Sequence, residues 1–284
     1  RSTSLHCGAQ IWMEQLLVGL LDGQRIEASV AQRGPTYRCP NCKGDLILRK
    51  GRIVSHHFAH KPPVSCSWAV GETQQHLAAK MQLRDGFRAR GYGAEVEVEV
   101  LSMAGDRRAD VLVTSQGGVH RIAIEVQHQP IDFGAMERRT IAYMAAGVPV
   151  LWMGILTEAI KDKAEPIIGG MRISQYSIRP WEKWAHAFGF KELWYVDPTN
   201  GELWLGVFSE HMIEKAGASW YNQYGEEESV SGYTRRSKRW RTLTLHGPYQ
   251  LDQIAISMPT RSPWESKAFR LPGGRYAKFS IAPK

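Results

Sequence analysis

Two runs of sequence decide the fold of this chain: Arg107-Arg-Ala-Asp-Val-Leu-Val113 and Arg121-Ile-Ala-Ile-Glu-Val-Gln127, which are connected through a Gly117-Gly118 turn. Apolar and β-branched residues dominate both runs, so the sequence predicts two adjacent strands. A third run, Glu95-Val-Glu-Val-Glu-Val100, precedes them and alternates strictly. Its valines are expected to face a core and its glutamates to face solvent, which completes a three-strand meander.

Helical patterns flank this meander on both sides. Residues 72–87 place apolar side chains near helical spacing, and a second helix is expected from about Gly134 to Ala146. The run Val148-Pro-Val-Leu-Trp152 reads as a buried fourth strand. The order helix, three strands, helix, strand predicts an α/β core in which helices flank a mixed central sheet.

Two carboxylates on the adjacent strands are the first candidates for chemistry. Asp110 and Glu125 each lie in an apolar strand, where a carboxylate is costly unless something compensates it. Two such groups on neighbouring strands suggest a shared divalent cation, and oxygen ligands that leave several waters in place suit Mg²⁺ or Mn²⁺. The alternative is a pair of salt bridges, with Arg108 and Arg121 as the partners.

Soft metal ligands gather ahead of the first helix. The candidates are Cys39, Cys42, His57, His60 and Cys66. A hairpin over residues 45–54 would return the chain to the Cys-x-x-Cys turn, and thiolate and imidazole ligands favour a closed, structural zinc site. A thiol redox pair is the alternative, although no thioredoxin-like strand precedes the motif.

We expect four of these five residues to bind zinc, namely Cys39, Cys42, His60 and Cys66. On a strand, His57 and His60 would point to opposite faces. His57 is therefore expected to be a core histidine, with ligation as its alternative role.

The charge balance favours a polyanionic partner, which we expect to be DNA. The chain has a formal net charge of +8 at pH 7 and a pI near 9.3. The clearest basic cluster consists of Arg235, Arg236, Lys238, Arg239 and Arg241 together with Trp240. Cations neutralise phosphates and an indole stacks on a base, while a solvated loop is the alternative for the same stretch.

The chain is expected to divide into three parts. Residues 11–68 would form the zinc-binding module, residues 69–156 the core, and residues 157–284 a Trp-rich, basic region without a long periodic element. No apolar run is long enough to span a bilayer, so a cytoplasmic protein without a membrane partner is expected. Residues 1–10 lack an initiator Met and an apolar stretch, and are expected to be a truncated or added end rather than a signal peptide.

The joint order of these motifs resembles a known nuclease family. Asp110 and Glu125-Val-Gln127 look like the PD-(D/E)XK signature, with Gln127 where a lysine usually stands. The whole arrangement resembles the competence protein CoiA family over about residues 16–153. The matching pieces are Cys39-Pro-x-Cys42, His57-Phe-Ala-His60, Glu72 with His76-Leu77, Arg108-Ala-Asp110, Glu125-Val-Gln127, and Arg138 with Tyr143.

The resemblance implies a restriction-endonuclease-like core behind a zinc-ribbon-like module, acting on DNA during the uptake of foreign DNA. It implies that Asp110 and Glu125 hold the catalytic metal, that Glu72 is a third acid, and that Gln127 positions water. Arg138 and Tyr143 would contact phosphate or buttress the site. For Glu72 and His76 the alternative is an exposed, capped helix start.

Three functions follow as expectations. The first is a metal-dependent deoxyribonuclease that processes incoming DNA. The second is a DNA-binding protein with a degenerate core that recruits recombination proteins. The third is a nuclease that defends the cell against phage or plasmid DNA.

Overall fold

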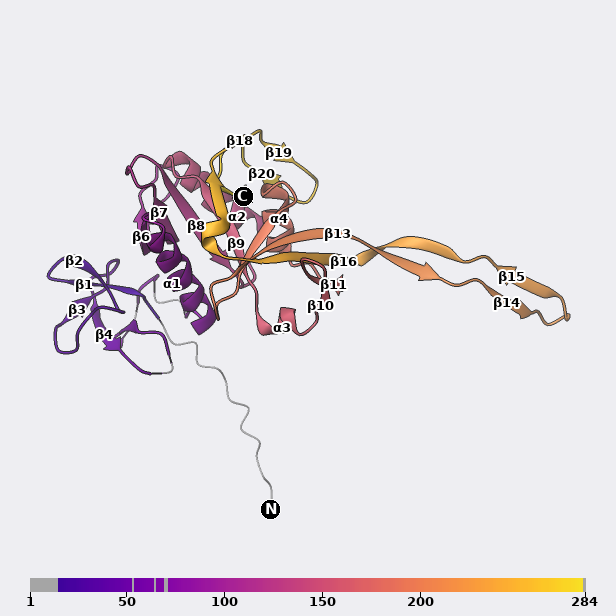
Figure 1. The fold of residues 1–284 in the computed structure, drawn as a ribbon, viewed down its shortest axis with the longest axis horizontal. Helices are drawn as coiled ribbons and strands as arrows, with labels where there is room; N and C mark the ends of the chain where they lie inside the picture. Colours follow the sequence, from indigo (N-terminus) through magenta and orange to yellow (C-terminus); the bar gives the residue numbers. More distant parts are fainter. Residues whose placement is uncertain (1–14, 53, 64, 69–70, 283–284) are drawn as a thin grey trace, which may run out of the picture.

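The computed structural model describes residues 15–52, 54–63, 65–68 and 71–282. The expected truncated end at residues 1–10 lies outside these ranges. Two sheets and an extended two-stranded projection dominate the described part of the chain (Figure 1). Within these ranges, no helix is both long and apolar enough to cross a membrane.

A nine-stranded mixed sheet forms the centre of the molecule. Its order is β10-β11-β16-β13-β12-β9-β8-β7-β6, and β9 pairs parallel with both β8 and β12 while the other neighbours are antiparallel. In chain order, the first four strands of this sheet are β6 (Gly93–Val100), β7 (Arg107–Thr114), β8 (Arg121–Gln127) and β9 (Val150–Ile155). The others are β10 (Glu165–Ile167), β11 (Gly170–Tyr176), β12 (Leu193–Val196), β13 (Leu203–Lys215) and β16 (Tyr233–Tyr249).

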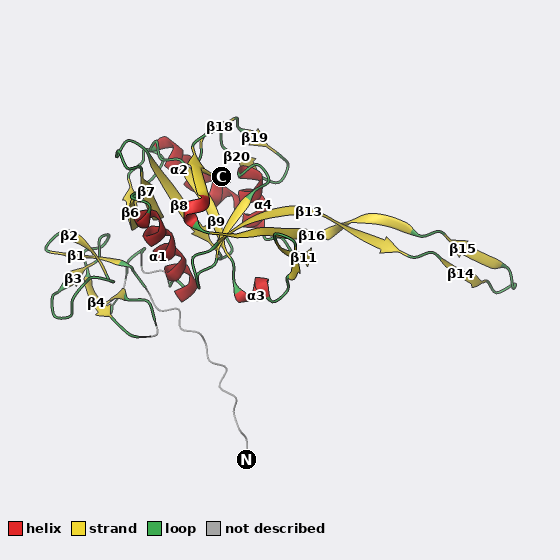
Figure 2. Ribbon diagram, viewed as in Figure 1, coloured by secondary structure: helices red, strands yellow, loops and turns green. Residues whose placement is uncertain are grey.

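Helices cover both faces of this sheet, as Figure 2 shows. On one face, α1 (Gln74–Ala89) packs Leu77, Leu83 and Phe87 against the strands. On the other, α2 (Phe133–Ala145) and α4 (Pro180–Phe188) pack Tyr143, Trp181 and Trp184. The short helix α3 (Glu158–Lys161) follows β9. The predicted mixed α/β class with flanking helices is confirmed.

After the large sheet the chain packs on both of its faces, with Phe269 and Leu271 in the core beside α2 and α4. A 3₁₀ turn, η1 (Leu251–Gln253), leads into paired short strands, and Ile254 and Phe279 join the core beneath α1. These strands are β17 (Ile254–Ser257), β18 (Thr260–Arg261), β19 (Trp264–Glu265), β20 (Arg270–Leu271), β21 (Gly274–Arg275) and β22 (Lys278–Ile281). They pair as β17–β22, β18–β21 and β19–β20.

A separate five-stranded sheet precedes α1. Its order is β2-β1-β3-β4-β5, and its strands are β1 (Val18–Leu21), β2 (Gln24–Glu27), β3 (Tyr37–Arg38), β4 (Asp45–Arg49) and β5 (His57–His60). Charged contacts dock it on the large sheet and on α1, because Arg25 donates to the carbonyl oxygen of Val96 at 2.7 Å and Arg84 of α1 pairs with Glu27.

Strand β6 departs from the expected alternation at Glu97. This residue has a φ of 55° and is skipped in the register between β6 and β7, which passes from the Val96–Val111 pair to the Val98–Ala109 pair. Asp110, the residue that would face it on β7, is skipped as well, so the register is the same on both sides and the alternation is interrupted without an inserted residue. The expectation that all three glutamates face solvent is therefore wrong for Glu97, which is fully buried.

The large sheet crosses the boundary that we expected at residue 156. Strands β10 to β13 and β16 extend the sheet that holds β6 to β9. Trp181, Trp184 and Trp194 are buried in its two cores, which explains much of the tryptophan content. Strands β13 and β16 have 13 and 17 residues, although the sequence of this region shows no long periodic element.

Candidate active site and metal centre

A cavity of about 470 Å³ opens where the start of α1 meets β7 and the end of β8. Acids and bases share its wall, and residues of the N-terminal part also contribute. The lining residues are Ser67, Trp68, Gly71, Glu72, His76, Asp106, Arg107, Arg108, Asp110, Val126, Gln127, His128, Gln129, Pro130, Ile131 and Arg139.

Local structure explains how Asp110 reaches this cavity. The antiparallel pairs between β7 and β8 run from Thr114 opposite Arg121 to Val111 opposite Ile124, one residue short of Asp110. At this point a side chain replaces the backbone as the acceptor: Asp110 Oδ2 accepts a hydrogen bond of 2.9 Å from the backbone N–H of Val126. The backbone pairing of β7 and β8 therefore ends at Asp110.

Glu72, His76 and Asp110 converge in the cavity. Their ligand atoms all lie within 4.8 Å of one another. The helix begins later than expected, at Gln74 rather than Glu72, because the Thr73 hydroxyl caps it by accepting from the His76 N–H at 3.2 Å. Glu72 thus precedes the helix but stays beside His76, and both side chains are nearly buried. They do not form the exposed helix start that was the alternative.

Electrostatics couple the three groups. His76 Nε2 lies 3.3 Å from Asp110 Oδ2, and His76 Nδ1 lies 3.0 Å from Glu72 Oε2 without hydrogen-bond geometry. Burial alone would lower the pKa of His76, but the charges of Asp110 and Glu72 outweigh it and raise that pKa to about 9. In turn the cationic neighbours His76 and Lys80 hold the pKa of Asp110 below its usual value against the effect of burial.

Lys80 lies on α1 one turn after His76 and is the cation that these acids share. Its ammonium group is fully buried, donates to Glu97 Oε1 at 2.8 Å and to Glu72 Oε2 at 2.5 Å, and lies 3.9 Å from Asp110 Oδ1. Burial opposes its charge, but these carboxylates raise the pKa of Lys80 above its ordinary value. The helical spacing of Glu72, His76 and Lys80 was visible in the sequence, whereas the inward turn of Glu97 was not.

Glu125 lies deeper and has its own partners. The Tyr143 hydroxyl donates to Glu125 Oε1, and Arg139 lies 3.1 Å from Oε2. Burial raises the pKa of Glu125 above its usual value in spite of Arg139. The salt bridges that were the alternative for the two acids do not form: Arg108 pairs with Glu72 at 3.1 Å, and Arg121 is exposed.

Helix α2 brings Arg139 to the site, while Arg138 is exposed on the outer side of the helix. Arg139 and Tyr143 are four residues apart and therefore share one face. The sequence interpretation selected Arg138; the same helical spacing from Tyr143 would have found Arg139.

Gln127 and His128 complete the wall at the end of β8. Gln127 lines the cavity, and its Nε2 donates to the carbonyl oxygen of Gln129 at 2.6 Å. His128 Nε2 lies 3.3 Å from the Thr73 hydroxyl. Burial and the charge of His76 lower the pKa of His128 to about 4, so this imidazole is neutral. Nothing in the sequence distinguished His128 from an ordinary surface histidine.

The cavity suits a divalent cation in its donor chemistry. Two carboxylates and one imidazole converge, and the buried Nδ1 of His76 has no hydrogen-bond partner among the described residues. Carboxylates are the ligands of Mg²⁺ and Mn²⁺, and an imidazole nitrogen is tolerated better by Mn²⁺. The cluster differs from the predicted pair, because it joins Asp110 to Glu72 and His76, with Glu125 held apart by Arg139 and Tyr143.

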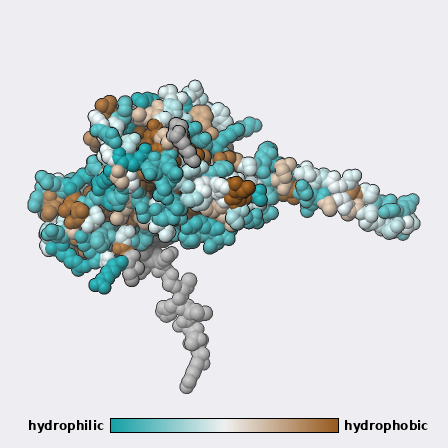
Figure 3. All heavy atoms as spheres, in the orientation of Figure 1, coloured by the Kyte–Doolittle hydropathy of each residue, from teal (hydrophilic) through white to brown (hydrophobic). Residues whose placement is uncertain are grey.

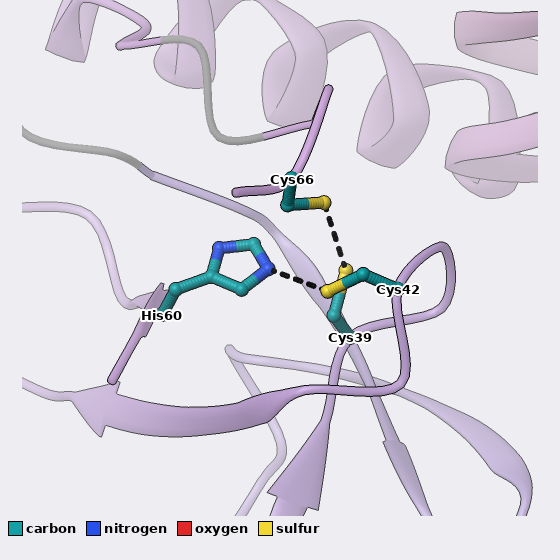
Figure 4. Close-up of side chains that lie close together, drawn as sticks. All are labelled: Cys39, Cys42, His60 and Cys66. Atoms are coloured by element: carbon teal, nitrogen blue, oxygen red, sulfur yellow. Dashed lines mark hydrogen bonds between the residues drawn. The ribbon is translucent and has the colours of Figure 1, made fainter. Parts of the chain in front are cut away.

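A second cluster lies in the N-terminal sheet and consists of Cys39, Cys42, His60 and Cys66 (Figure 4). These side chains point toward one another from the turn after β3, from β5 and from the segment before α1. Cys39 Sγ is 3.8 Å from Cys66 Sγ, and Cys42 Sγ is 3.4 Å from His60 Nε2. Ligands of a tetrahedral zinc ion, with bonds of about 2.3 Å to sulfur, would lie about 3.8 Å apart.

Hydrogen bonds and burial act differently on these thiols. Burial raises the pKa of Cys39 to about 12. At Cys66 burial is outweighed by donors, including the side-chain amide of Asn41 at 3.4 Å, and the pKa falls to about 7. The donor set fits a closed zinc site. His57 lies outside the cluster, with Nδ1 2.8 Å from the carbonyl oxygen of Ser55.

The basic stretch lies on β16, where the projection leaves the body. Arg235, Arg236, Lys238 and Arg239 are exposed, Trp240 and Arg241 are half-buried, and Arg236 pairs with Glu210 at 2.6 Å. The stretch is part of a strand rather than the loop that was the alternative. It lies away from the cavity between α1 and β7 (Figure 1).

Comparisons with known proteins match the two parts of the chain that carry these clusters. The family described as competence protein CoiA, nuclease-like domain, matches residues 72–214, and the N-terminal domain of the same family matches residues 21–69. The competence protein CoiA of Bacillus subtilis (strain 168) is 28% identical over 118 residues, which is 41% of this chain and 31% of that protein. The alignment thus spans about a third of that relative. None of the solved structures matches the chain. The chain belongs to the competence protein CoiA family and carries its nuclease-like domain.

Proposed function

We propose that this protein is a metal-dependent deoxyribonuclease that processes incoming DNA. The observation that carries the proposal is the convergence of Glu72, His76 and Asp110 on one point of a cavity that is also lined by arginine side chains. Buried acids with strongly shifted pKa values in a cleft are typical of functional sites. The name of the family favours a role in competence over one in defence.

We assign the metal to Asp110, Glu72 and His76, with Glu125 as an inner acid that enters the ligand set or supports it. A divalent ion bound there would neutralise charge on a phosphate and lower the pKa of a bound water. Gln127 lines the same wall with a side-chain amide that is able to orient water by hydrogen bonds, although it brings no positive charge.

Positive charge at the site comes from other elements. Lys80 is fully buried against Glu72 and Glu97, so its role is to hold the acids in place. Arg139 is about one-third exposed beside Glu125 and faces the cavity, where it is placed to contact a phosphate. In this proposal Arg139 takes the role that the sequence suggested for Arg138, and Tyr143 fixes the Glu125 carboxylate.

We also propose the finer architecture that these sites require. The core would be restriction-endonuclease-like from about residue 69, with the strands after residue 156 extending its sheet. The preceding module would be zinc-ribbon-like and held by a structural zinc. Cytoplasmic action and contact with recombination proteins are part of the same proposal. The exposed cations of β16 would add sequence-independent contacts to DNA.

DNA binding without cleavage is the second candidate function. One observation favours it: the acids are already compensated by cations, namely Lys80 and Arg108 beside Glu72 and Arg139 beside Glu125. A site that has lost its metal would need such internal compensation.

The deciding experiment incubates the purified chain with single-stranded, nicked and branched DNA in Mg²⁺, Mn²⁺ or EDTA. Cleavage that requires a divalent ion supports the nuclease. DNA that is bound but intact with every metal and substrate would support the second candidate instead.

A further inference from the structure

Residues 211–240 form a two-stranded arm that leaves the body of the protein (Figure 1). Up to Glu210 and Arg241 the ribbon has a third strand beside it, since Arg241 still pairs with Tyr176 of β11. Beyond that point β13 and β16 pair only with each other, and β14 (Ala218–Tyr221) with β15 (Glu227–Val230) ends the arm. An isolated two-stranded ribbon is marginally stable in water.

The arm exposes apolar side chains out of proportion to its length. Six of the seventeen exposed large hydrophobic residues in the described part of the chain lie on it: Met212, Trp220, Tyr221, Tyr224, Val230 and Tyr233. Trp220 pairs with Glu228, and Val230 pairs with Ala218, so Trp220 and Val230 share one face of the ribbon. Exposed apolar side chains concentrated in this way are typical of an interaction site.

Acids gather at the end of the arm and cations near the body, where β13 also carries the exposed acids Glu210 and Glu214. The end of the arm carries Glu226, Glu227 and Glu228, which are exposed and have no cationic partner among the described residues. Near the body, Arg235, Lys238 and Arg239 form a basic shoulder, and no described carboxylate pairs with them. Figure 3 shows hydrophilic atoms at the end of the arm and paler, less polar atoms along its middle.

This distribution is self-complementary. If two arms lie side by side in opposite directions, the acidic end of each meets the basic shoulder of the other, and the contact occurs twice about one two-fold axis. Glu227 and Arg235 are eight residues apart, or about 27 Å of extended strand, so Val230 and Tyr233 would lie near the axis. An apolar centre with charged flanks is the usual anatomy of an interface. Nucleic acid fits the shoulder but is repelled by the three glutamates.

We propose that this protein forms a homodimer in which the two arms pair antiparallel, the acidic end of one on the basic shoulder of the other. The pairing buries Trp220, Val230 and Tyr233 and covers part of the open edges of the ribbon. It does not depend on the proposed nuclease activity. Since the arm end and DNA would use the same cations, they compete for the shoulder.

Charge reversal on the full-length chain tests the dimer. Mass is measured by light scattering after gel filtration, and by sedimentation over a range of protein concentrations. Wild type is expected to be a dimer. Reversing the end (Glu226→Lys, Glu227→Lys, Glu228→Lys) or the shoulder (Arg235→Glu, Lys238→Glu, Arg239→Glu) should each weaken dimerisation roughly 100-fold.

Complementation makes the test specific. An equimolar mixture of the two variants should form a heterodimer, because both of its end-to-shoulder contacts are again of opposite charge. A chain that carries all six reversals should dimerise alone. The control pair Asp162→Lys and Asp252→Lys changes exposed acids off the arm and should leave the dimer intact. A monomeric wild type, a dimer that neither reversal weakens, or a mixture that stays monomeric would overturn the proposal.

Discussion

His76 of α1 and Asp110 of β7 meet in the cavity, with the imidazole Nε2 3.3 Å from the carboxylate Oδ2. The contact joins the capped start of the helix to the point where two strands part. It places an imidazole between two acids, Glu72 and Asp110, which are 38 residues apart in the sequence. The helix start therefore belongs to the site as much as the strands do.

Loss of Lys80 is expected to destabilise the fold strongly. Lys80→Met would leave Glu72 and Glu97 buried beside each other without their shared cation. Breaking a buried ion pair in this way costs about 3–5 kcal/mol of unfolding free energy, measurable by urea denaturation. Lys163→Met, at an exposed lysine, serves as the control and should change that free energy by less than about 0.5 kcal/mol.

The double variant Lys80→Met/Glu97→Gln separates charge from packing. Glu97→Gln removes one of the two carboxylates that Lys80→Met leaves without a cation. It should therefore restore part of the lost unfolding free energy, so the effects of the two substitutions should not be additive. If the double variant is less stable than Lys80→Met alone, the ion pair is not the source of the effect.

Zinc is expected at one ion per chain, bound by the four-residue cluster around Cys39. Cys39→Ser should remove the metal and lower the melting temperature by roughly 5–10 °C, because a structural zinc contributes folding free energy. Elemental analysis of protein purified without chelator and calorimetry are the measurements. Cys7→Ser changes the remaining cysteine, outside the described residues, and is the control. Well-folded, active protein with far less than one zinc would refute this prediction.

Substitution of the adjacent α2 residues Arg138 and Arg139 should affect the rate of DNA cleavage differently. Arg139 contacts Glu125 at 3.1 Å and lines the cavity, whereas Arg138 is exposed. Arg139→Ala should lower the rate of DNA cleavage by roughly 100-fold, the usual cost of removing one donor that stabilises developing charge. Arg138→Ala should leave the rate within about twofold. Equal losses in both variants would show that the site does not use Arg139 selectively.

Cations on β16 should contribute affinity for DNA without sequence preference. Changing Arg235, Arg236 and Arg239 together to Ala should lower the magnitude of the slope of log K against log salt by about 2.7, with similar weakening on unrelated sequences. Binding is measured at protein concentrations where the chain is monomeric. An unchanged slope would mean that these residues do not touch phosphate.

Local patterns in the sequence predicted the elements well but not the contacts between them. The alternation of β7 and β8 and the Cys-x-x-Cys turn carried direct information, so Asp110, Glu125 and the four-residue cysteine and histidine cluster were found. The inward turn of Glu97 accompanies a positive φ at that residue, which period-two alternation does not reveal. The long strands β13 and β16 lack a buried face along the arm, so their sequences show no alternation of apolar and polar residues from which they could be predicted.

Cleavage by Asp110→Asn, compared with wild type and Asp106→Asn in Mn²⁺, tests the proposed metal site most directly. Asp106 lines the same cavity but stands outside the Glu72–His76–Asp110 cluster, and its carboxylate accepts from the N–H of Ser102 at 2.9 Å. We predict that Asp110→Asn cuts no faster than wild type in EDTA, while it still folds and binds DNA. Asp106→Asn should cut at close to the wild-type rate. Metal-dependent cleavage by Asp110→Asn at the wild-type rate would place the active site elsewhere in the chain.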